Sequence, residues 1–192
     1  MGKIYYVMGK SSSGKDTIYK HLTAEYSRFH TIVPYTTRPV REGERNGVEY
    51  YFADDVCLEK MRRDGKIIEE RSYNTECGIW TYFTADDGQI DLSRYDYLMI
   101  GTLESYQALG QYFGEDALVP LYIEVEDGER LSRALAREKK QVHPRYAEMC
   151  RRFLSDEKDF SEDNLRRAGI TRRFENNDLS ECLAEIESYL GL

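Results

Sequence analysis

The sequence predicts an α/β fold in which a central parallel sheet lies between two layers of helices. Short apolar runs typical of buried strands, at residues 4–8, 95–100 and 118–125, alternate with stretches whose apolar residues recur every three or four positions. Strands that alternate with helices form a parallel sheet covered on both faces. Between about residues 35 and 90 aromatic strand segments interrupt this pattern, which predicts an inserted β-rich lobe.

The elements are expected in a definite order. The first strand leads into a helix that begins near Lys15 and carries Ile18, Leu22 and Tyr26 at four-residue steps, and a second strand is expected over residues 30–35. Strands and one short helix are expected in the lobe, at residues 49–52, 54–64, 66–70 and 79–84. Alternating strands and helices follow, at residues 95–100, 103–113, 118–125, 128–138, 144–154, 173–175 and 179–190.

Two arginine-bearing helices are expected after residue 127. In the first, Leu131 and Leu135 form the apolar side, while Arg130 and Arg133 are expected on a solvated face. Arg145, near the start of the second helix, is expected to be solvated as well. Residues 139–143 have no apolar period, so we expect a mobile connection between the two helices.

Composition limits the classes of function. A chain of 192 residues fits one domain, and its net charge of −8 argues against nucleic acid or an anionic membrane as a partner. The cysteines are too sparse for a disulfide framework, so reduced thiols in a cytoplasm are expected at Cys57, Cys77, Cys150 and Cys182. The N-terminus lacks a basic region followed by a long apolar stretch, and no window approaches the roughly 20 apolar residues that span a bilayer. We expect a soluble cytoplasmic protein, either a monomer or a homodimer.

A glycine-rich segment follows the first strand and precedes the first helix. Its residues have the spacing of a P-loop: Gly9, Lys10, Ser11, Ser12, Ser13, Gly14, Lys15, Asp16 and Thr17. In such a loop the glycines let backbone N–H groups point at a phosphate chain, and the helix dipole favours the same anion. The alternative is a glycine turn with a surface lysine, but the strand before and the helix after the loop favour phosphate binding.

Asp16 makes the metal side of this loop unusual. Most such loops have Ser or Thr after the lysine to ligate Mg²⁺, whereas here the first hydroxyl comes one residue later, at Thr17. One hypothesis is that Asp16 takes the metal-side role, directly or through water, because Mg²⁺ prefers oxygen ligands. The alternative is that Asp16 only stabilises the helix N-terminus, an effect of roughly 0.3–1 kcal/mol.

A second anion site is expected in the lobe. Arg38 and Arg41 are three residues apart on a proline-stiffened segment, so both guanidinium groups could bind one phosphate. Tyr50 and Tyr82 offer hydroxyl donors, and Glu69 could accept two N–H groups from a base edge, which favours guanine over adenine. Because Glu70 is adjacent, only one of the two glutamates can face a pocket from a strand.

This block resembles the GMP-binding segment of guanylate kinases. The matching residues are Thr36, Thr37, Arg38, Arg41, Glu44, Gly47, Glu49, Tyr50 and Phe52. The resemblance implies a P-loop NTPase three-layer fold in one guanylate-kinase-like domain over residues 1–192. Its core would span residues 1–34 and 93–192, its NMP-binding lobe about 35–90 and its helical lid about 128–160. It also implies transfer of a phosphoryl group from ATP to GMP with Mg²⁺.

The resemblance assigns roles to individual residues. Arg38, Arg41 and Tyr50 would hold the GMP phosphate, Glu69 the guanine, and Asn176 would lie beside the adenine. The lid arginines would be Arg137 with Arg151 or Arg152. Catalytic roles would fall to Lys15, Arg38, Arg137 and Arg152, and further acceptor contacts to Tyr35, Tyr82 and Thr84.

Some segments depart from the family pattern. Pro34 and Tyr35 stand where a small hydroxyl residue is usual, the segment with Tyr82 and Thr84 is rearranged, and residues 99–104 lack the family's acidic pair. Two alternatives therefore stay open. One is a kinase of another phosphorylated acceptor such as ribose 1,5-bisphosphate, which the Gly-Lys-Asp loop also resembles. The other is a guanylate-kinase-like module that binds a nucleotide or a protein without turnover.

Overall fold

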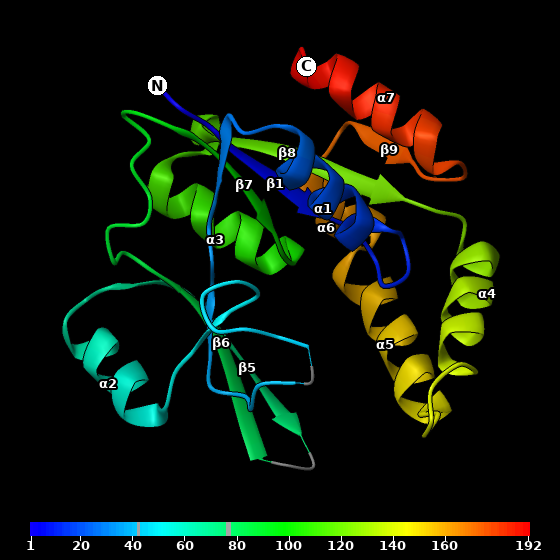
Figure 1. The fold of residues 1–192 in the computed structure, drawn as a ribbon, viewed down its shortest axis with the longest axis horizontal. Coiled ribbons are helices and arrows are strands. Elements are labelled where there is room, and N and C mark those ends of the chain that lie inside the picture. The colour runs from blue at the N-terminus through cyan, green and yellow to red at the C-terminus, as the bar shows by residue number, and fades with distance from the viewer. Residues whose placement is uncertain (42, 76–77) are drawn as a thin grey trace.

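The structure is a computed structural model that describes residues 1–41, 43–75 and 78–192, without the side chain of Thr75. Its main sheet has five parallel strands in the order β2-β7-β1-β8-β9 (Figure 1). The strands are β1 (Ile4–Met8), β2 (Phe29–Thr31), β7 (Asp96–Ile100), β8 (Leu118–Glu124) and β9 (Arg173–Glu175). A central parallel sheet was predicted from the alternation of elements, and the structure confirms it.

Helices cover both faces of this sheet. The helices of the core are α1 (Lys15–Glu25), α3 (Leu103–Phe113), α4 (Asp127–Glu138), α5 (Tyr146–Asp159), α6 (Glu162–Arg167) and α7 (Leu179–Leu190), with a short 3₁₀ turn at Glu115–Ala117. Side chains of β1 alternate between two apolar clusters, because successive residues of a strand point to opposite faces. Tyr6 packs with Leu109 of α3, whereas Val7 packs with Ile18 of α1 and Ile186 of α7.

The inserted segment forms a second sheet with the strand order β4-β3-β6-β5. Its elements are β3 (Tyr35–Thr36), β4 (Tyr51–Phe52), helix α2 (Asp55–Arg63), β5 (Ile67–Thr75) and β6 (Gly78–Ala85). One face packs on α2 through Leu58 and Phe83. Register places Thr36, Tyr82 and Glu69 on the opposite face. The division of the chain into core, lobe and lid remains a prediction.

The expected strand over residues 30–35 is wrong as a single element. The chain leaves the main sheet after Thr31 and enters the second sheet at Tyr35. Between them, the Val33 N–H donates to the side chain of Gln89 at 2.8 Å, and Pro34 has no N–H to offer to a strand. Backbone donors are therefore satisfied outside either sheet at this point, and two short strands replace one.

Helix α6 follows Ser161 and was not predicted from the sequence. Residues 139–143 form turns and bends between α4 and α5, so they are a connection, as expected, and its mobility remains a prediction. Cys57, Cys150 and Cys182 are free thiols, and Cys77 lies outside the described residues. Among the described residues, no helix combines the length and apolar character that crossing a membrane requires.

Candidate functional site

The loop between β1 and α1 has a backbone that glycine makes possible. Gly14 lies at φ 86°, in the left-handed region, and a Cβ built on it would lie 2.3 Å from the Asn176 side chain. Asn176 is buried, and its Nδ2 donates to the Ser13 carbonyl at 2.8 Å. Asn176 thus lies directly beneath the loop, so a larger residue at position 14 would disturb both segments.

The loop also carries polar groups without partners. Among the described residues, the buried hydroxyls of Ser12 and Ser13 have no hydrogen-bond partner. A buried hydroxyl left unpaired is costly, and an anion at the helix N-terminus is a fitting partner for such donors. Lys15 extends from the same helix end, with its Nζ 3.7 Å from the Asp16 carboxylate. This donor set suits a phosphate chain.

The loop does not form a metal cage of its own. No group of three or more His, Cys, Asp or Glu side chains that could hold a metal occurs in the described part of the chain. Asp16 is 78 % exposed and offers a single carboxylate beside Lys15. Mg²⁺ usually binds through one or two carboxylates together with substrate phosphates and water, so one carboxylate at this position fits an ion that arrives with a nucleotide.

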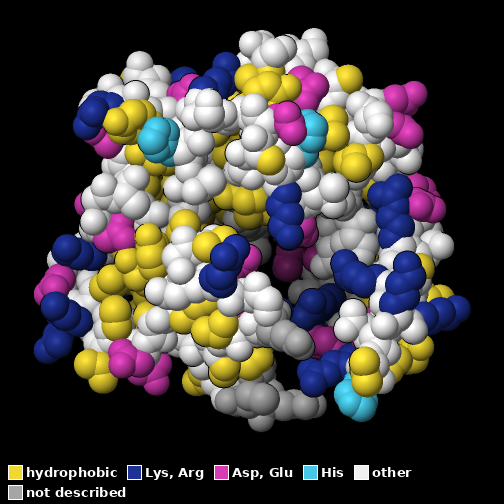
Figure 2. Space-filling model, viewed as in Figure 1, with side chains coloured by type: hydrophobic (Ala, Val, Ile, Leu, Met, Phe, Trp, Pro, Cys, Tyr) yellow, Lys and Arg dark blue, Asp and Glu magenta, His cyan; other side chains and the backbone are white. Residues whose placement is uncertain are grey.

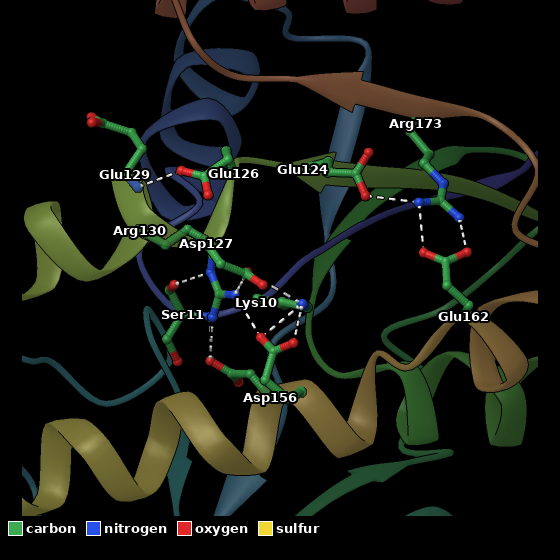
Figure 3. A network of polar contacts seen from close by, with 11 residues as sticks. Lys10, Ser11, Glu124, Glu126, Asp127, Glu129, Arg130, Asp156, Glu162 and Arg173 are labelled. Carbon is green, nitrogen blue, oxygen red and sulfur yellow. Dashed lines mark hydrogen bonds and ion pairs between the residues drawn. The ribbon is translucent and has the colours of Figure 1, made fainter.

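Arg130 overturns an expectation from the sequence. It was expected on a solvated face, but its side chain is only 1 % exposed and lies between α4, α5 and the loop (Figure 3). Its guanidinium donates to the Ser11 carbonyl at 3.1 Å and to the Glu157 carboxylate at 2.9 Å. We call Arg130 and its charged neighbours the Arg130 network; its members are Lys10, Asp127, Arg130, Asp156 and Glu157.

The network explains which face of α4 is buried. Arg130 and Ala134, one helical turn apart, are the buried residues of α4, while Leu131 and Leu135 are 38 % and 37 % exposed. The predicted apolar side is therefore wrong, because this helix packs its charged side against the acidic residues of α5. Arg133 also departs from expectation, since its Nη2 donates to the Asn176 carbonyl at 3.0 Å, whereas Arg145 is exposed as expected.

The loop and α5 are joined directly by Asp156. The Ser11 N–H donates to the Asp156 carboxylate at 2.8 Å, and the same carboxylate oxygen accepts from Arg130 at 3.3 Å. Lys10 donates to both oxygens of Glu157, at 2.8 and 2.9 Å. A carboxylate of the second arginine-bearing helix thus occupies one amide donor of the loop.

In the second sheet, the side chain of Arg38 is buried, and we use the word pocket for its surroundings, which include Glu44 and Tyr50. It forms a two-point pair with Glu44, with both N–O distances at 2.7 Å, and its guanidinium carbon lies 4.9 Å from the centre of the Tyr50 ring. The hydrogen bonds from Arg38 lower the pKa of Glu44, and burial raises the pKa of Tyr50. The Nε of Arg38 is buried without a partner among the described residues. Arg41 does not join this pocket: its side chain is exposed, and only its backbone N–H reaches Glu44, at 2.9 Å.

Glu69 faces the pocket and Glu70 does not. Glu69 is 6 % exposed and accepts the Thr84 hydroxyl at 2.7 Å, whereas Glu70 pairs with Arg62 on the outer side. Tyr82 belongs to the same face, and its ring centre lies 5.6 Å from that of Tyr50. The structure therefore brings Tyr50, Glu69, Tyr82 and Thr84 onto one face of the sheet.

Tyr35 is not part of this group, contrary to the expectation of an acceptor contact. Its ring stacks on Phe83, 5.0 Å away, on the face that packs against α2, and its hydroxyl donates to Asp87 at 2.6 Å. Neighbouring residues of a strand point to opposite faces, so when Thr36 faces the pocket Tyr35 cannot. Arg71, which sequence reasoning missed, does face the pocket and donates to Glu69 at 2.9 Å. Its spacing of two residues from Glu69 was the available signal.

The candidate lid arginines lie along α4 and α5. Arg137 is exposed and has no side-chain partner among the described residues, while Arg151 and Arg152 both donate to Glu148, at 2.7 and 2.9 Å. These two hydrogen bonds lower the pKa of Glu148 to about 2. Figure 2 shows the molecule hollowed between the second sheet and these helices, with Lys and Arg side chains gathered along the helical side.

Comparisons with known proteins find similarity to guanylate kinases. The family model described as guanylate kinase matches residues 1–78. The guanylate kinase of Zymomonas mobilis subsp. mobilis is 37% identical over 68 residues, which cover 35% of this chain and 32% of that protein. The guanylate kinase of Thermobifida fusca is 39% identical over 61 residues, covering 32% and 31%. Each match thus spans about a third of the relative's length.

A solved structure matches the whole fold. The crystal structure of guanylate kinase from Anaplasma phagocytophilum aligns with a TM-score of 0.67 over 99% of this chain and 85% of that one, at 17% identity. At this identity the likeness establishes the fold alone. The family-model match over residues 1–78 covers the loop and the Arg38 block, whereas the part from α3 to α7 is related through its fold.

Proposed function

We propose, from the premise that this chain is a divergent relative of the guanylate kinases, that it transfers the γ-phosphoryl group of ATP to GMP. The observation that carries the proposal is that buried donors lack a partner, within the described part of the chain, at two separate places, which we assign as anion sites. One consists of the Ser12 and Ser13 hydroxyls in the loop, and the other is the Nε of Arg38 in the second sheet. Two phosphate-binding sites on either side of one hollow suit a donor and an acceptor nucleotide.

The loop is assigned to the ATP phosphates. Lys15 would reach the far phosphates, and Asn176, which supports the loop from below, would lie near the nucleoside. Arg137 and Arg152 would neutralise the triphosphate when α4 and α5 approach it. Mg²⁺, held through the phosphates and Asp16, would supply charge neutralisation at the transferred group.

The second sheet is assigned to GMP. The Nε of Arg38 and the hydroxyls of Tyr50 and Tyr82 would donate to its phosphate, with Arg41 closing from the exposed side. Glu69 and Thr84 lie on the same face of the sheet and would meet the base. Glu44 accepts two hydrogen bonds from Arg38, so the guanidinium is oriented before any substrate binds.

The chemistry needs little beyond this placement. Phosphoryl transfer depends on aligning donor and acceptor and on neutralising the charge that spreads over the transferred group. The attacking oxygen of a nucleoside monophosphate is already ionised, so no general base is required. Closure of the helices over the hollow would exclude water and limit wasteful hydrolysis of ATP.

An ADP-release assay with several acceptors tests the proposal. GMP, dGMP, AMP, UMP and ribose 1,5-bisphosphate would each be supplied with ATP and Mg²⁺, and GMP is expected to give the highest kcat/KM. Turnover with ribose 1,5-bisphosphate alone would support a sugar phosphate kinase instead. Binding of GMP without ADP release under any condition would support a non-catalytic module. The sparse cysteines and the net charge of −8 support a cytoplasmic enzyme of small nucleotides.

A further inference from the structure

Arg71 is a buried arginine inside the acceptor pocket. Its side chain is 11 % exposed, and it extends from β5 on the same face as Glu69 and Tyr82. Its Nε donates to Glu69 Oε2 at 2.9 Å, its Nη2 to Glu69 Oε1 at 3.3 Å, and its Nη1 to the Thr102 hydroxyl at 2.8 Å. Burial is the largest single effect and lowers the pKa of Arg71, but Glu69, Tyr6 and Tyr73 together outweigh it, so this pKa is raised. Arg71 therefore stays charged next to the carboxylate assigned to the base.

The hydrogen bonds already present limit what Glu69 can accept. A carboxylate offers about four lone-pair positions. Arg71 uses one on Oε2 and one on Oε1, and the Thr84 hydroxyl uses the other on Oε1. One position on Oε2 is left, whereas guanine presents two donors to a carboxylate, its N1–H and its 2-amino group. Glu69 as placed here can accept only one of them.

Arg71 has guanidinium N–H groups that its contacts with other described residues do not engage. Its contacts among the described residues engage three of its N–H groups, out of about five in a guanidinium side chain. Arg71 and Glu69 together therefore present one donor next to one acceptor. That pair is complementary to the 6-oxo oxygen and the N1–H of a purine. Guanine and hypoxanthine share this edge, and they differ only in the 2-amino group that Glu69 has no room to accept.

We propose that Arg71 is a specificity-determining residue. With Arg71 in place, the pocket binds the 6-oxo oxygen and the N1–H of the acceptor base and makes no hydrogen bond to the 2-amino group. The inference rests on the proposed function and deepens it. GMP and IMP are both acceptors, and their kcat/KM values lie within about tenfold of each other. Removal of Arg71 frees Glu69 to accept the 2-amino group, so the preference for GMP over IMP increases. One additional hydrogen bond to a carboxylate corresponds to about tenfold.

The test compares GMP and IMP as acceptors for the native protein and two variants, Arg71→Ala and Arg71→Gln. The ratio of kcat/KM for GMP to that for IMP should rise about tenfold in both variants. Arg62→Ala is the matched control, because it removes an arginine that pairs with Glu70 outside the pocket, and its ratio should equal that of the native protein. Melting temperatures of all four proteins show whether each is folded.

The outcomes separate the inference from the proposed function. A ratio that stays unchanged in folded Arg71 variants, or a native preference for GMP above about a hundredfold, overturns the role of Arg71 and leaves the kinase activity standing. If neither nucleotide supports ADP release, the kinase activity is refuted, and calorimetric Kd values for GMP and IMP then test Arg71 through the same ratio. Failure of both nucleotides to bind the native protein overturns both.

Discussion

Replacing Arg130 with methionine tests whether a buried charged network holds α4 and α5 on the loop. Arg130 is 1 % exposed, donates to Ser11 and Glu157, and lies with its guanidinium carbon 4.7 Å from the Phe153 ring centre. Removing it leaves Asp127 and its acidic neighbours facing one another with Lys10 as their remaining cation in the network. Breaking a buried ion pair by removal of one partner costs about 3–5 kcal/mol. Lys10 offsets part of this, so we expect a loss of about 3 kcal/mol.

The loss is measurable by urea unfolding followed by circular dichroism, and by thermal melting. For a chain of this length 3 kcal/mol corresponds to about 6–12 °C in Tm. Arg166→Met is the matched control: Arg166 is 77 % exposed and pairs with an exposed Asp163, so its replacement should cost less than about 1 kcal/mol. An Arg130→Met protein whose free energy of unfolding lies within about 1 kcal/mol of the native value would refute the reasoning.

Three further predictions concern the two proposed anion sites. Lys15→Met should lower kcat by about 10²–10³-fold, because in the proposed reaction Lys15 supplies a charge that stabilises the transferred phosphoryl group. Lys20→Met on the exposed side of α1 should leave kcat unchanged, and equal rates for both variants would contradict the assignment. Asp16→Ser should raise the Mg²⁺ concentration that gives half-maximal turnover, and an identical Mg²⁺ titration would remove Asp16 from the metal side. Glu44→Gln should lower the free energy of unfolding by about 3 kcal/mol at neutral pH, since Arg38 stays buried without its counter-charge. Because the pKa of Glu44 is lowered in the folded state, its contribution is present above the ordinary value of 4.5 and is lost as pH falls below it. Stability curves of native and Glu44→Gln proteins should therefore converge in acid, and parallel curves would contradict the pairing.

The main sheet and the loop could be predicted because short-range sequence patterns determine both. The apolar run of β1 and the glycines at positions 9 and 14 each determine structure within a few residues. The choice between Glu69 and Glu70 could be narrowed by alternation along β5, and the structure resolved it through the Thr84 contact. Such features need no knowledge of distant parts of the chain.

The features that were missed depend on contacts between distant segments. Arg130 is buried because it pairs with Asp156 and Glu157 on another helix. The sequence of α4 alone does not indicate that these carboxylates lie beside it. Tyr35 was assigned to the acceptor site by position in a motif, whereas its side chain is directed by the pairing of β3 with β6. Arg71 contacts Thr102 only because β5 packs against the start of α3.

The contact between Ser11 and Asp156 has a consequence for how the loop is filled. A carboxylate and a phosphate oxygen cannot share one N–H donor at 2.8 Å, and their like charges repel. The Asp156 carboxylate thus occupies this N–H donor as an anion supplied by the chain itself. If the Ser11 N–H binds a phosphate oxygen of the proposed nucleotide, the Asp156 carboxylate must first release it. Binding at the loop would therefore be coupled to the position of Asp156 on α5.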